Sequence, residues 1–200
     1  MLVIGLTGNI GCGKSSLSNI LKNNSLDIID ADIISRDIMN DKNLLNKIFE
    51  TFGNDIKRED GTLNRKELGK IVFNDDEKLI ILNNITHPAI KNEIKKRIKE
   101  IEDNNRNIVV VDAALLIEGN FLDLVDRLVV ISCDLDVQLN RIMKRDNITK
   151  EEAISRIKSQ MDQNEKIKYG DYIIDNSKGL DELNYKANKL ITYIKENWCE

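Results

Sequence analysis

The feature that most constrains this 200-residue chain is a glycine-rich run near its start, Gly8–Ser15, with the pattern G-x-x-x-x-G-K-S. An apolar segment, Leu2–Leu6, precedes it, and a helical pattern, Ser15–Lys22, follows it. Glycines permit positive φ, so successive N–H groups of such a loop can converge on phosphate oxygens. The next helix points its own N-terminal N–H groups at the same place. The run therefore predicts a nucleotide-binding loop, termed here the phosphate loop.

Each residue type in the phosphate loop has an expected task. Lys14 would reach the β- and γ-phosphates, and the Ser15 hydroxyl would ligate Mg²⁺. Cys12 would act through its backbone N–H. Its thiol, beside Lys14 at a helix N-terminus, would favour the thiolate, although a small side chain that is merely tolerated is the simpler interpretation. The loop thus predicts a nucleoside triphosphate with Mg²⁺ but does not identify the reaction.

Short apolar runs that alternate with helical patterns indicate an α/β fold with a parallel sheet. The third run is apolar throughout, as expected of a strand covered by helices on both faces. We predict strands at Leu2–Leu6, Leu26–Asp30, Ile108–Asp112, Leu128–Ser132 and Tyr172–Ile174. Further helices are predicted at Glu151–Lys168 and Leu180–Glu196. The whole chain, 1–200, would form one domain around this sheet.

The segment between the second and third strands is far longer than a single crossover helix needs. Residues 36–105 are mostly helical in pattern, with a turn expected at Glu59–Gly61 and a break at His87–Pro88, the only proline. We interpret this segment as a helical insertion over the carboxyl ends of the strands, where doubly wound sheets bind ligands.

Carboxylates follow two of the predicted strands. Asp32, in Asp30-Ala31-Asp32, could accept a hydrogen bond from an attacking hydroxyl, or it could cap the next helix. Asp112 ends the third strand, where a carboxylate can hold the hydration shell of Mg²⁺. The alternative is the ordinary strand-ending aspartate of an α/β domain.

Four basic residues are further candidates. Arg141 and Arg145 lie four residues apart on a predicted helix, so their guanidinium groups could clamp phosphates or belong to a solvated face. His87 is the only histidine, and a histidine beside proline is more often a packing element than a catalyst. Arg65 could bind an anionic substrate or lie on the plain surface.

Composition excludes several classes of function. The net charge is −4 without any basic block, and aromatic residues make up only 4%, which disfavours nucleic-acid partners. Three scattered cysteines indicate neither a zinc site nor a disulfide framework. No apolar run approaches the roughly 18 residues of a membrane span, and the N-terminus is interpreted as a strand rather than a signal peptide. We expect a cytoplasmic protein without membrane partners. Its oligomeric state is not indicated.

Taken together, these residues resemble the dephospho-coenzyme A kinase family. The phosphate loop alone is shared by many families, but the ordered set is specific and spans nearly the whole chain. It comprises Gly5–Ser15, Asp30–Asp32, Gly61–Arg65 with Val72 and Phe73, Ile85–Ile90, Leu115–Glu118, Arg141 and Arg145, Arg156 with Gln160, and Asp171–Asn176. Asn9, Cys12, Ala114 and Gly170 replace the family's commoner Gly, Ser, Pro and Ala, and none of these changes removes a catalytic group.

The resemblance implies a five-stranded parallel sheet, a helical substrate domain and a mobile lid at about 138–168. It also implies that ATP, with Mg²⁺, phosphorylates the ribose 3′-hydroxyl of dephospho-CoA in the last step of coenzyme A synthesis. By position, ATP would be bound by Gly8, Gly11, Cys12, Gly13, Lys14, Ser15 and Ser16. Asp32 would contact the attacking hydroxyl, Arg141 and Arg145 would belong to the lid, Asn176 would approach adenine, and Arg65 and His87 would face the substrate.

Other functions stay open beside this one. Another small-molecule kinase, of the nucleoside monophosphate or shikimate type, would share the phosphate loop, and only the middle segments separate these enzymes. A regulatory GTPase would carry an Asn-Lys-x-Asp motif, whereas Asn46-Lys47 and Asn188-Lys189 lack the aspartate.

Overall fold

The computed structural model describes residues 1–72 and 75–199, which separate into two compact units. The sheet unit consists of Met1–Asp30 and Arg97–Glu200, and the helical unit of Ala31–Lys96. The helical unit begins and ends earlier than the predicted insertion, 36–105. The substrate-binding role of that insertion stays a prediction.

All strands of the sheet run parallel, in the order β2-β3-β1-β4-β5. The strands are β1 (Leu2–Gly8), β2 (Asp27–Asp30), β3 (Ile108–Asp112), β4 (Arg127–Ser132) and β5 (Tyr172–Asp175). Each of the five predicted strands is confirmed within two residues. Because parallel strands share one direction, the phosphate loop after β1 and Asp112 at the end of β3 lie at the same edge of the sheet.

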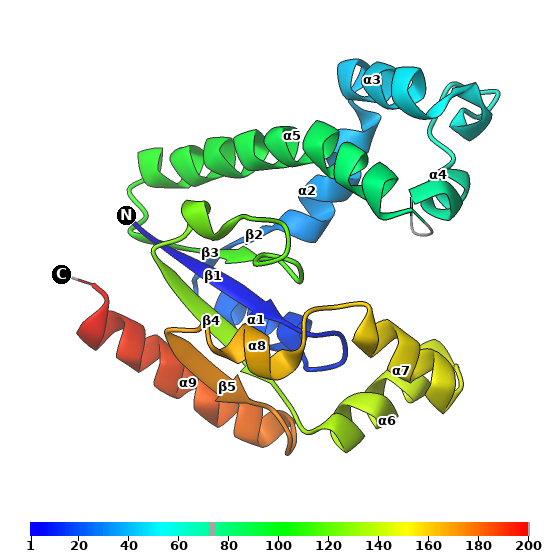
Figure 1. Ribbon diagram of the computed structural model, residues 1–200. Coiled ribbons are helices and arrows are strands. Elements are labelled where there is room, and N and C mark those ends of the chain that lie inside the picture. Colours follow the sequence, from blue (N-terminus) through cyan, green and yellow to red (C-terminus); the bar gives the residue numbers. More distant parts are fainter. Residues whose placement is uncertain (73–74, 200) are drawn as a thin grey trace. The chain divides into compact units, whose positions relative to one another are not determined.

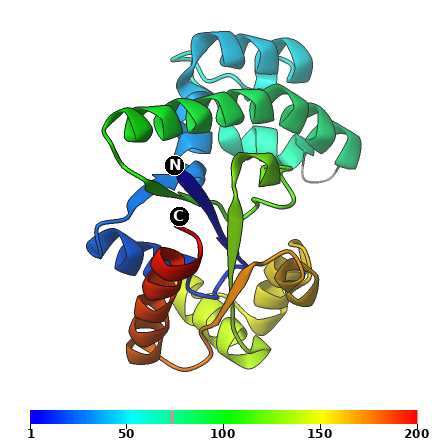
Figure 2. The ribbon, with the colours of Figure 1, turned by 90° about the vertical axis from the view of Figure 1, so that its left-hand side faces the viewer.

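Helices cover both faces of the sheet, as predicted (Figure 1). They are α1 (Lys14–Asn23), α6 (Leu135–Asp146), α7 (Lys150–Lys158), α8 (Gln163–Ile167) and α9 (Leu180–Asn197), with a 3-10 turn, η3, at Leu122–Leu124. Figure 2 shows α1 and α9 on one side of the sheet and α8 on the other. An apolar cluster of this unit joins β1, β3 and β4 to α1 and α9, with Leu17 and Leu190 fully buried in it.

The single helix predicted at Glu151–Lys168 is wrong, because the chain breaks it into α7 and α8. The side chain of Asp162 accepts hydrogen bonds from the N–H groups of Asn164 (2.8 Å) and Glu165 (3.3 Å), so a new helix begins there. The backbone before Asp162 is therefore released from helical hydrogen bonding and can contact the phosphate loop.

The helical unit consists of α2 (Ala31–Asp37), α3 (Lys42–Phe52), α4 (Arg65–Val72), most of α5 (Asp76–Asp103), and two 3-10 turns, η1 (Ile38–Asn40) and η2 (Asn54–Ile56). An apolar cluster of its own forms its core, with Ile48 and Ile56 fully buried. The predicted turn at Glu59–Gly61 is confirmed: Gly61 adopts φ 82° and its N–H donates to Arg58 O at 2.9 Å. Phe73 lies outside the described residues.

The break predicted at His87–Pro88 is wrong, because Pro88 lies inside the continuous helix α5. A proline in a helix removes one backbone hydrogen bond. Here buried residues on either side of it, Thr86 and Ile90, hold the helix in place by packing. In the described part of the chain, no helix is both long and apolar enough to cross a membrane.

Candidate active site

The phosphate loop joins β1 to α1, as predicted, and its backbone is shaped for an anion. Gly11 and Gly13 adopt φ values of 80° and 94°, which other residues rarely tolerate. The first intrahelical hydrogen bond of α1 runs from Leu17 N to Gly13 O at 3.1 Å. The N–H groups of the first helical turn precede this bond and need acceptors from outside the helix. Phosphate oxygens can supply them.

Two glycines of the loop are also required by close contacts. A Cβ at Gly8 would lie 2.5 Å from the carbonyl oxygen of Ile131, and a Cβ at Gly13 would lie 2.2 Å from Nδ2 of Asn176. Asn176 is buried after β5, and its Nδ2 donates to the carbonyl of Cys12 at 2.8 Å. Asn176, which was predicted to approach adenine, therefore supports the phosphate loop through its hydrogen bond to the backbone of Cys12.

Lys14 and Asp112 form a buried ion pair at the carboxyl edge of the sheet. Their side chains are 12% and 5% exposed, respectively. Burial raises the pKa of the Asp112 carboxyl and outweighs the Lys14 ammonium and the Ser18 hydroxyl, which lower it. Asp30, opposite Asp112 in the β2–β3 register, adds to the rise. A buried carboxylate of this kind gains from a nearby cation.

The chemistry of these groups fits a Mg²⁺ ion that is held jointly with nucleotide phosphates. The described residues contain no group of three or more His, Cys, Asp or Glu side chains that could hold a metal alone. Mg²⁺ typically takes one or two protein oxygens and completes its shell with phosphates and water. The exposed Ser15 and the Asp112 carboxylate, both predicted metal ligands, offer such oxygens near the loop.

The predicted thiolate character of Cys12 is wrong. Its Sγ lies 3.3 Å from Sγ of Cys133, and both thiols are free and buried. The hydrogen bond with Cys133 and burial raise the pKa of the Cys12 thiol far above its usual range. Cys12 Sγ also donates to Oε1 of Gln163 at 3.2 Å. The thiol of Cys12 is therefore a buried packing group, which agrees with the simpler interpretation of a small side chain tolerated at this position.

Arg141, on α6, lies on the phosphate-loop side of its helix. Its positive charge lowers the pKa of both Cys12 and Cys133, although it is not the leading influence on either thiol. Its Nη1 is buried and has no hydrogen-bond partner among the described residues. A guanidinium nitrogen in this situation is suited to an incoming phosphate.

Arg145, unlike Arg141, is paired with a carboxylate on its own helix. Its Nε and Nη2 donate to the carboxylate of Asp146 at 2.7 and 2.9 Å, and its side chain is 58% exposed. Arg156, on α7, pairs with the same carboxylate and so links α7 to α6. The structure therefore places Arg141, but not Arg145, beside the loop.

Three of the predicted site residues lie in the helical unit. Asp32 is exposed in the first turn of α2, directly after β2. At this position a carboxylate also interacts favourably with the positive end of the helix dipole. Arg65 begins α4 and donates from Nη2 to the carbonyl of Arg36 at 2.7 Å. His87 is half-buried in α5, and burial lowers its pKa, so it is neutral at pH 7.

Three amide side chains to which the sequence assigned no role hold the loop. Gln138 Nε2 donates to Ile10 O at 2.7 Å, Gln160 Oε1 accepts from Ile10 N at 2.8 Å, and Asn9 Nδ2 donates to Met161 O at 2.8 Å. A cavity of about 360 Å³ adjoins them. One signal for Gln138 was present: a glutamine among the apolar positions of an amphipathic helix, next to Leu139.

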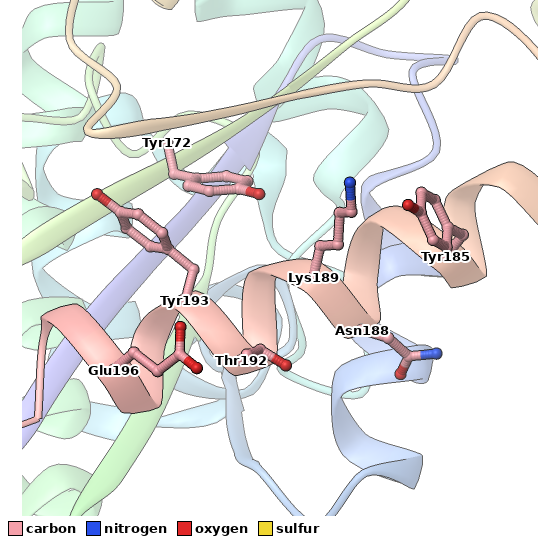
Figure 3. A pocket seen from close by; sticks show the side chains of 7 residues that line it. All are labelled: Tyr172, Tyr185, Asn188, Lys189, Thr192, Tyr193 and Glu196. Atoms are coloured by element: carbon pink, nitrogen blue, oxygen red, sulfur yellow. The ribbon is translucent and has the colours of Figure 1, made fainter.

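A second cavity, of about 390 Å³, lies between α9 and the start of β5 (Figure 3). The rings of Tyr172 and Tyr193 are 5.1 Å apart at its one end, and the Lys189 ammonium lies 4.7 Å from the ring of Tyr185 at the other. Tyr172 begins β5, so this part of the cavity lies at the amino-terminal ends of the strands, whereas the phosphate loop lies at their carboxyl ends. None of the described lining residues belongs to the phosphate loop. The cavity therefore has no part in the phosphate site.

Comparison with known proteins gives one consistent result. The dephospho-CoA kinase family model matches residues 2–182. A dephospho-CoA kinase of Carboxydothermus hydrogenoformans is 44% identical over 197 residues, covering 98% of this chain and 94% of the relative. One of Listeria innocua is 39% identical, covering 96% and 95%.

Solved structures agree with this result. A dephospho-CoA kinase from Campylobacter jejuni superposes with a TM-score of 0.72 at 32% identity, covering 96% of each chain. A shikimate kinase from Acinetobacter baumannii, with a TM-score of 0.59 at 17% identity, covers 100% of this chain and 96% of its own and shares the fold alone. By sequence over nearly its full length, and by fold, this chain is a member of the dephospho-CoA kinase family.

Proposed function

We propose that this protein transfers the γ-phosphoryl group of ATP to the ribose 3′-hydroxyl of dephospho-CoA, giving coenzyme A and ADP. One observation carries the proposal: the family match extends over residues 2–182 and so includes far more than the phosphate loop. The loop alone would fit a nucleoside monophosphate or shikimate kinase equally well, and the likeness to shikimate kinases is one of fold.

The sheet unit would bind the triphosphate. The N–H groups of Gly11–Ser16 would surround the β- and γ-phosphates, and the Lys14 ammonium would neutralise charge that develops on them. Ser15 and Asp112 would hold Mg²⁺, which neutralises phosphate charge when it is bound. Lys14 and Asp112 are already paired, so both charges stand ready in the site before the nucleotide arrives.

Arg141 would contact phosphate during transfer, because its buried Nη1 has no acceptor in the described residues. Arg145 would need to leave Asp146 before it could do the same. The segment at about 138–168 would act as the lid. Asn176 would border the adenine from its place behind the loop, where its amide already supports Cys12.

The helical unit would bind the acceptor. Asp32 would accept a hydrogen bond from the 3′-hydroxyl and receive its proton late in a loose transition state, so that orientation is its main task. The cation of Arg65 would attract an acceptor phosphate. His87, neutral at pH 7, would contribute a hydrogen bond rather than a charge. A cytoplasmic location remains a prediction.

A panel of acceptors tests the proposal. ADP release would be measured with Mg-ATP and, separately, dephospho-CoA, adenosine, AMP and shikimate, with coenzyme A as the matched control whose 3′-position already carries phosphate. We expect turnover with dephospho-CoA only, and a product that gains one phosphate by mass spectrometry. Equal or faster turnover with AMP or shikimate would overturn the assignment.

A further inference from the structure

Ile10, at the tip of the phosphate loop, is held at both of its backbone polar atoms. Its N–H donates to Gln160 Oε1 at 2.8 Å, and its carbonyl accepts from Gln138 Nε2 at 2.7 Å. The neighbouring Asn9 adds a third bond, from its Nδ2 to the carbonyl of Met161 at 2.8 Å. We refer to Gln138 and Gln160 as the glutamine clamp.

The two glutamines come from opposite ends of one segment. Gln138 lies in the first half of α6, and Gln160 follows the end of α7. The α6–α7 hairpin (Leu135–Lys158) carries Arg141, and Asp146 ties its two helices together through Arg156. Figure 1 shows α6 and α7 beside one another at the loop end of α1. The hairpin is thus fastened to the phosphate loop on both of its sides.

The clamp determines where the next loop amide points. In a trans peptide the C=O and the N–H of one plane point in opposite directions. The Ile10 carbonyl and the Gly11 N–H share such a plane, so the bond from Gln138 to the carbonyl directs the Gly11 N–H away from Gln138. Because Gly11 is a glycine at φ 80°, its backbone would otherwise turn easily. The hydrogen bond therefore supplies rigidity that the glycine lacks.

Packing alone does not fix these side chains. Gln138 and Gln160 both line the cavity of about 360 Å³ beside the loop, together with Asn9. Gln138 is only 2% exposed, so its amide is costly to bury without a partner. The open space leaves the hydrogen bonds to Ile10 as the interactions that hold the amides in place.

We propose that Gln138 and Gln160 are positioning residues that hold the phosphate loop ready for nucleotide and couple it to the α6–α7 hairpin. The proposal rests on the ATP site of the proposed function and assigns it two residues that do not touch the reacting atoms. Loss of one such bond lets the loop visit shapes that bind phosphate poorly, which lowers the apparent affinity by the fraction still competent. We expect the dissociation constant for Mg-ATP to rise about tenfold per bond lost.

A matched pair of substitutions tests the polarity of the clamp. Gln160→Glu keeps an acceptor for the Ile10 N–H, whereas Gln138→Glu replaces a donor with a carboxylate that faces the Ile10 carbonyl. Both add one negative charge beside the same residue. We expect the Mg-ATP dissociation constant from calorimetry to rise at least about tenfold more in Q138E than in Q160E at pH 8. The difference between the two dissociation constants should become smaller as the pH falls toward the pKa of the introduced carboxyl, because the protonated form of Q138E can donate a hydrogen bond again.

Gln160→Met and Gln138→Met remove the bonds without adding charge, and Gln160 is less buried than Gln138, so its substitution disturbs packing less. For Q160M we expect KM for ATP to rise about tenfold, while kcat and KM for the acceptor stay within about twofold. A lower Tm with an unchanged ATP dissociation constant would overturn the clamp alone. Wild-type protein that binds no Mg-ATP would overturn the proposed function as well.

Discussion

The two units of this protein bury very different kinds of side chain. In the described residues, every buried polar or charged side chain except one belongs to the sheet unit: Thr7, Asn9, Ser18, Asp112, Ser132, Gln138, Lys166 and Asn176. The exception in the helical unit is Thr86. Buried polar groups lower stability unless each has partners. In the sheet unit, Asn9, Gln138 and Asn176 hydrogen-bond at the phosphate loop, where fixed dipoles suit a bound phosphate. The core of the helical unit is an apolar cluster.

The two units also differ in how far apart in the sequence their buried hydrogen-bonded residues lie. Thr86 Oγ1 donates to Leu82 O at 2.9 Å, within its own helix. Lys166 is fully buried in α8, and its Nζ donates to Ala114 O at 3.1 Å and to Glu118 Oε1 at 3.0 Å. Those partners follow β3, far away in the sequence. The polar interior of the sheet unit thus joins distant segments, and that of the helical unit does not.

The largest effect should come from the centre of the sheet unit. Lys14→Ala removes the ammonium that neutralises phosphate charge and leaves Asp112 buried without its cation. We expect kcat to fall at least about 10³-fold, by the reasoning that applies to lost electrostatic donors. Steady-state ADP release measures this. Lys99→Ala, at an exposed ion pair of the same unit, is the control and should retain wild-type activity. Near-native kcat in K14A would show that the loop is not the phosphate site.

Asp32 is the residue by which the helical unit would enter the chemistry. Asp32→Asn keeps the size but removes the charge and basicity, so we expect kcat to fall roughly 10²–10⁴-fold with little change in ATP affinity. Asp37→Asn, at the other end of α2, is the matched control. If Asp32 only stabilises the helix N-terminus, D32N will instead show a lower Tm and nearly normal turnover. Calorimetry and kinetics on the two variants separate these cases.

Stability should reveal the contrast between the buried polar groups directly. Lys166→Met leaves Glu118 without its cation, and we expect it to lower the free energy of unfolding by about 3 kcal/mol. Thr86→Val removes a local bond in a side chain of the same shape and should cost less than about 1 kcal/mol. Urea denaturation measures both. Adding Glu118→Gln to Lys166→Met should recover part of the loss, and no recovery would contradict the ion-pair explanation.

The smallest effect concerns the thiols. Cys12 and Cys133 are buried, whereas Cys199 is exposed. We expect iodoacetamide to modify only Cys199 in the native protein, with or without Mg-ATP, and all three cysteines after denaturation. Peptide mapping by mass spectrometry identifies the modified positions. Rapid labelling of native Cys12 that Mg-ATP suppresses would show instead that the loop opens and that nucleotide closes it.

The strands of this fold were easier to predict from the sequence than its helices. The strands were predictable because a buried parallel strand has a continuous apolar sequence, as in the four apolar residues that precede Asp112 in β3. The helical unit was predictable only in outline. At Pro88 the local preference for a break gave way to the buried residues around it. A helix of the sheet unit was also predicted wrongly, because a strong local cap at Asp162 divides a segment that looked like one helix.

The residues of the candidate site also differ in how well the sequence predicts their positions. Lys14, Ser15 and the glycines were predictable because a fixed local spacing produces their geometry. The bond from Gln138 to Ile10 was not, because the two residues are 128 positions apart and nothing in the spacing of either relates them. The different surroundings of Arg141 and Arg145 depend on Asp146, which pairs with Arg145, and no spacing in the sequence predicts that pair.

The chain contains one tryptophan, Trp198, and it packs edge-on against Tyr193 with ring centroids 5.5 Å apart. Tyr193 in turn contacts Tyr172 of β5 (Figure 3). The indole therefore reports on the docking of α9 against the sheet. Intrinsic fluorescence excited at the indole is therefore a probe of the sheet unit only, since the helical unit has no tryptophan. Circular dichroism in the far ultraviolet registers the helices of both units. Recorded together during denaturation, the two signals form a built-in test of whether the units melt as one cooperative body or in succession.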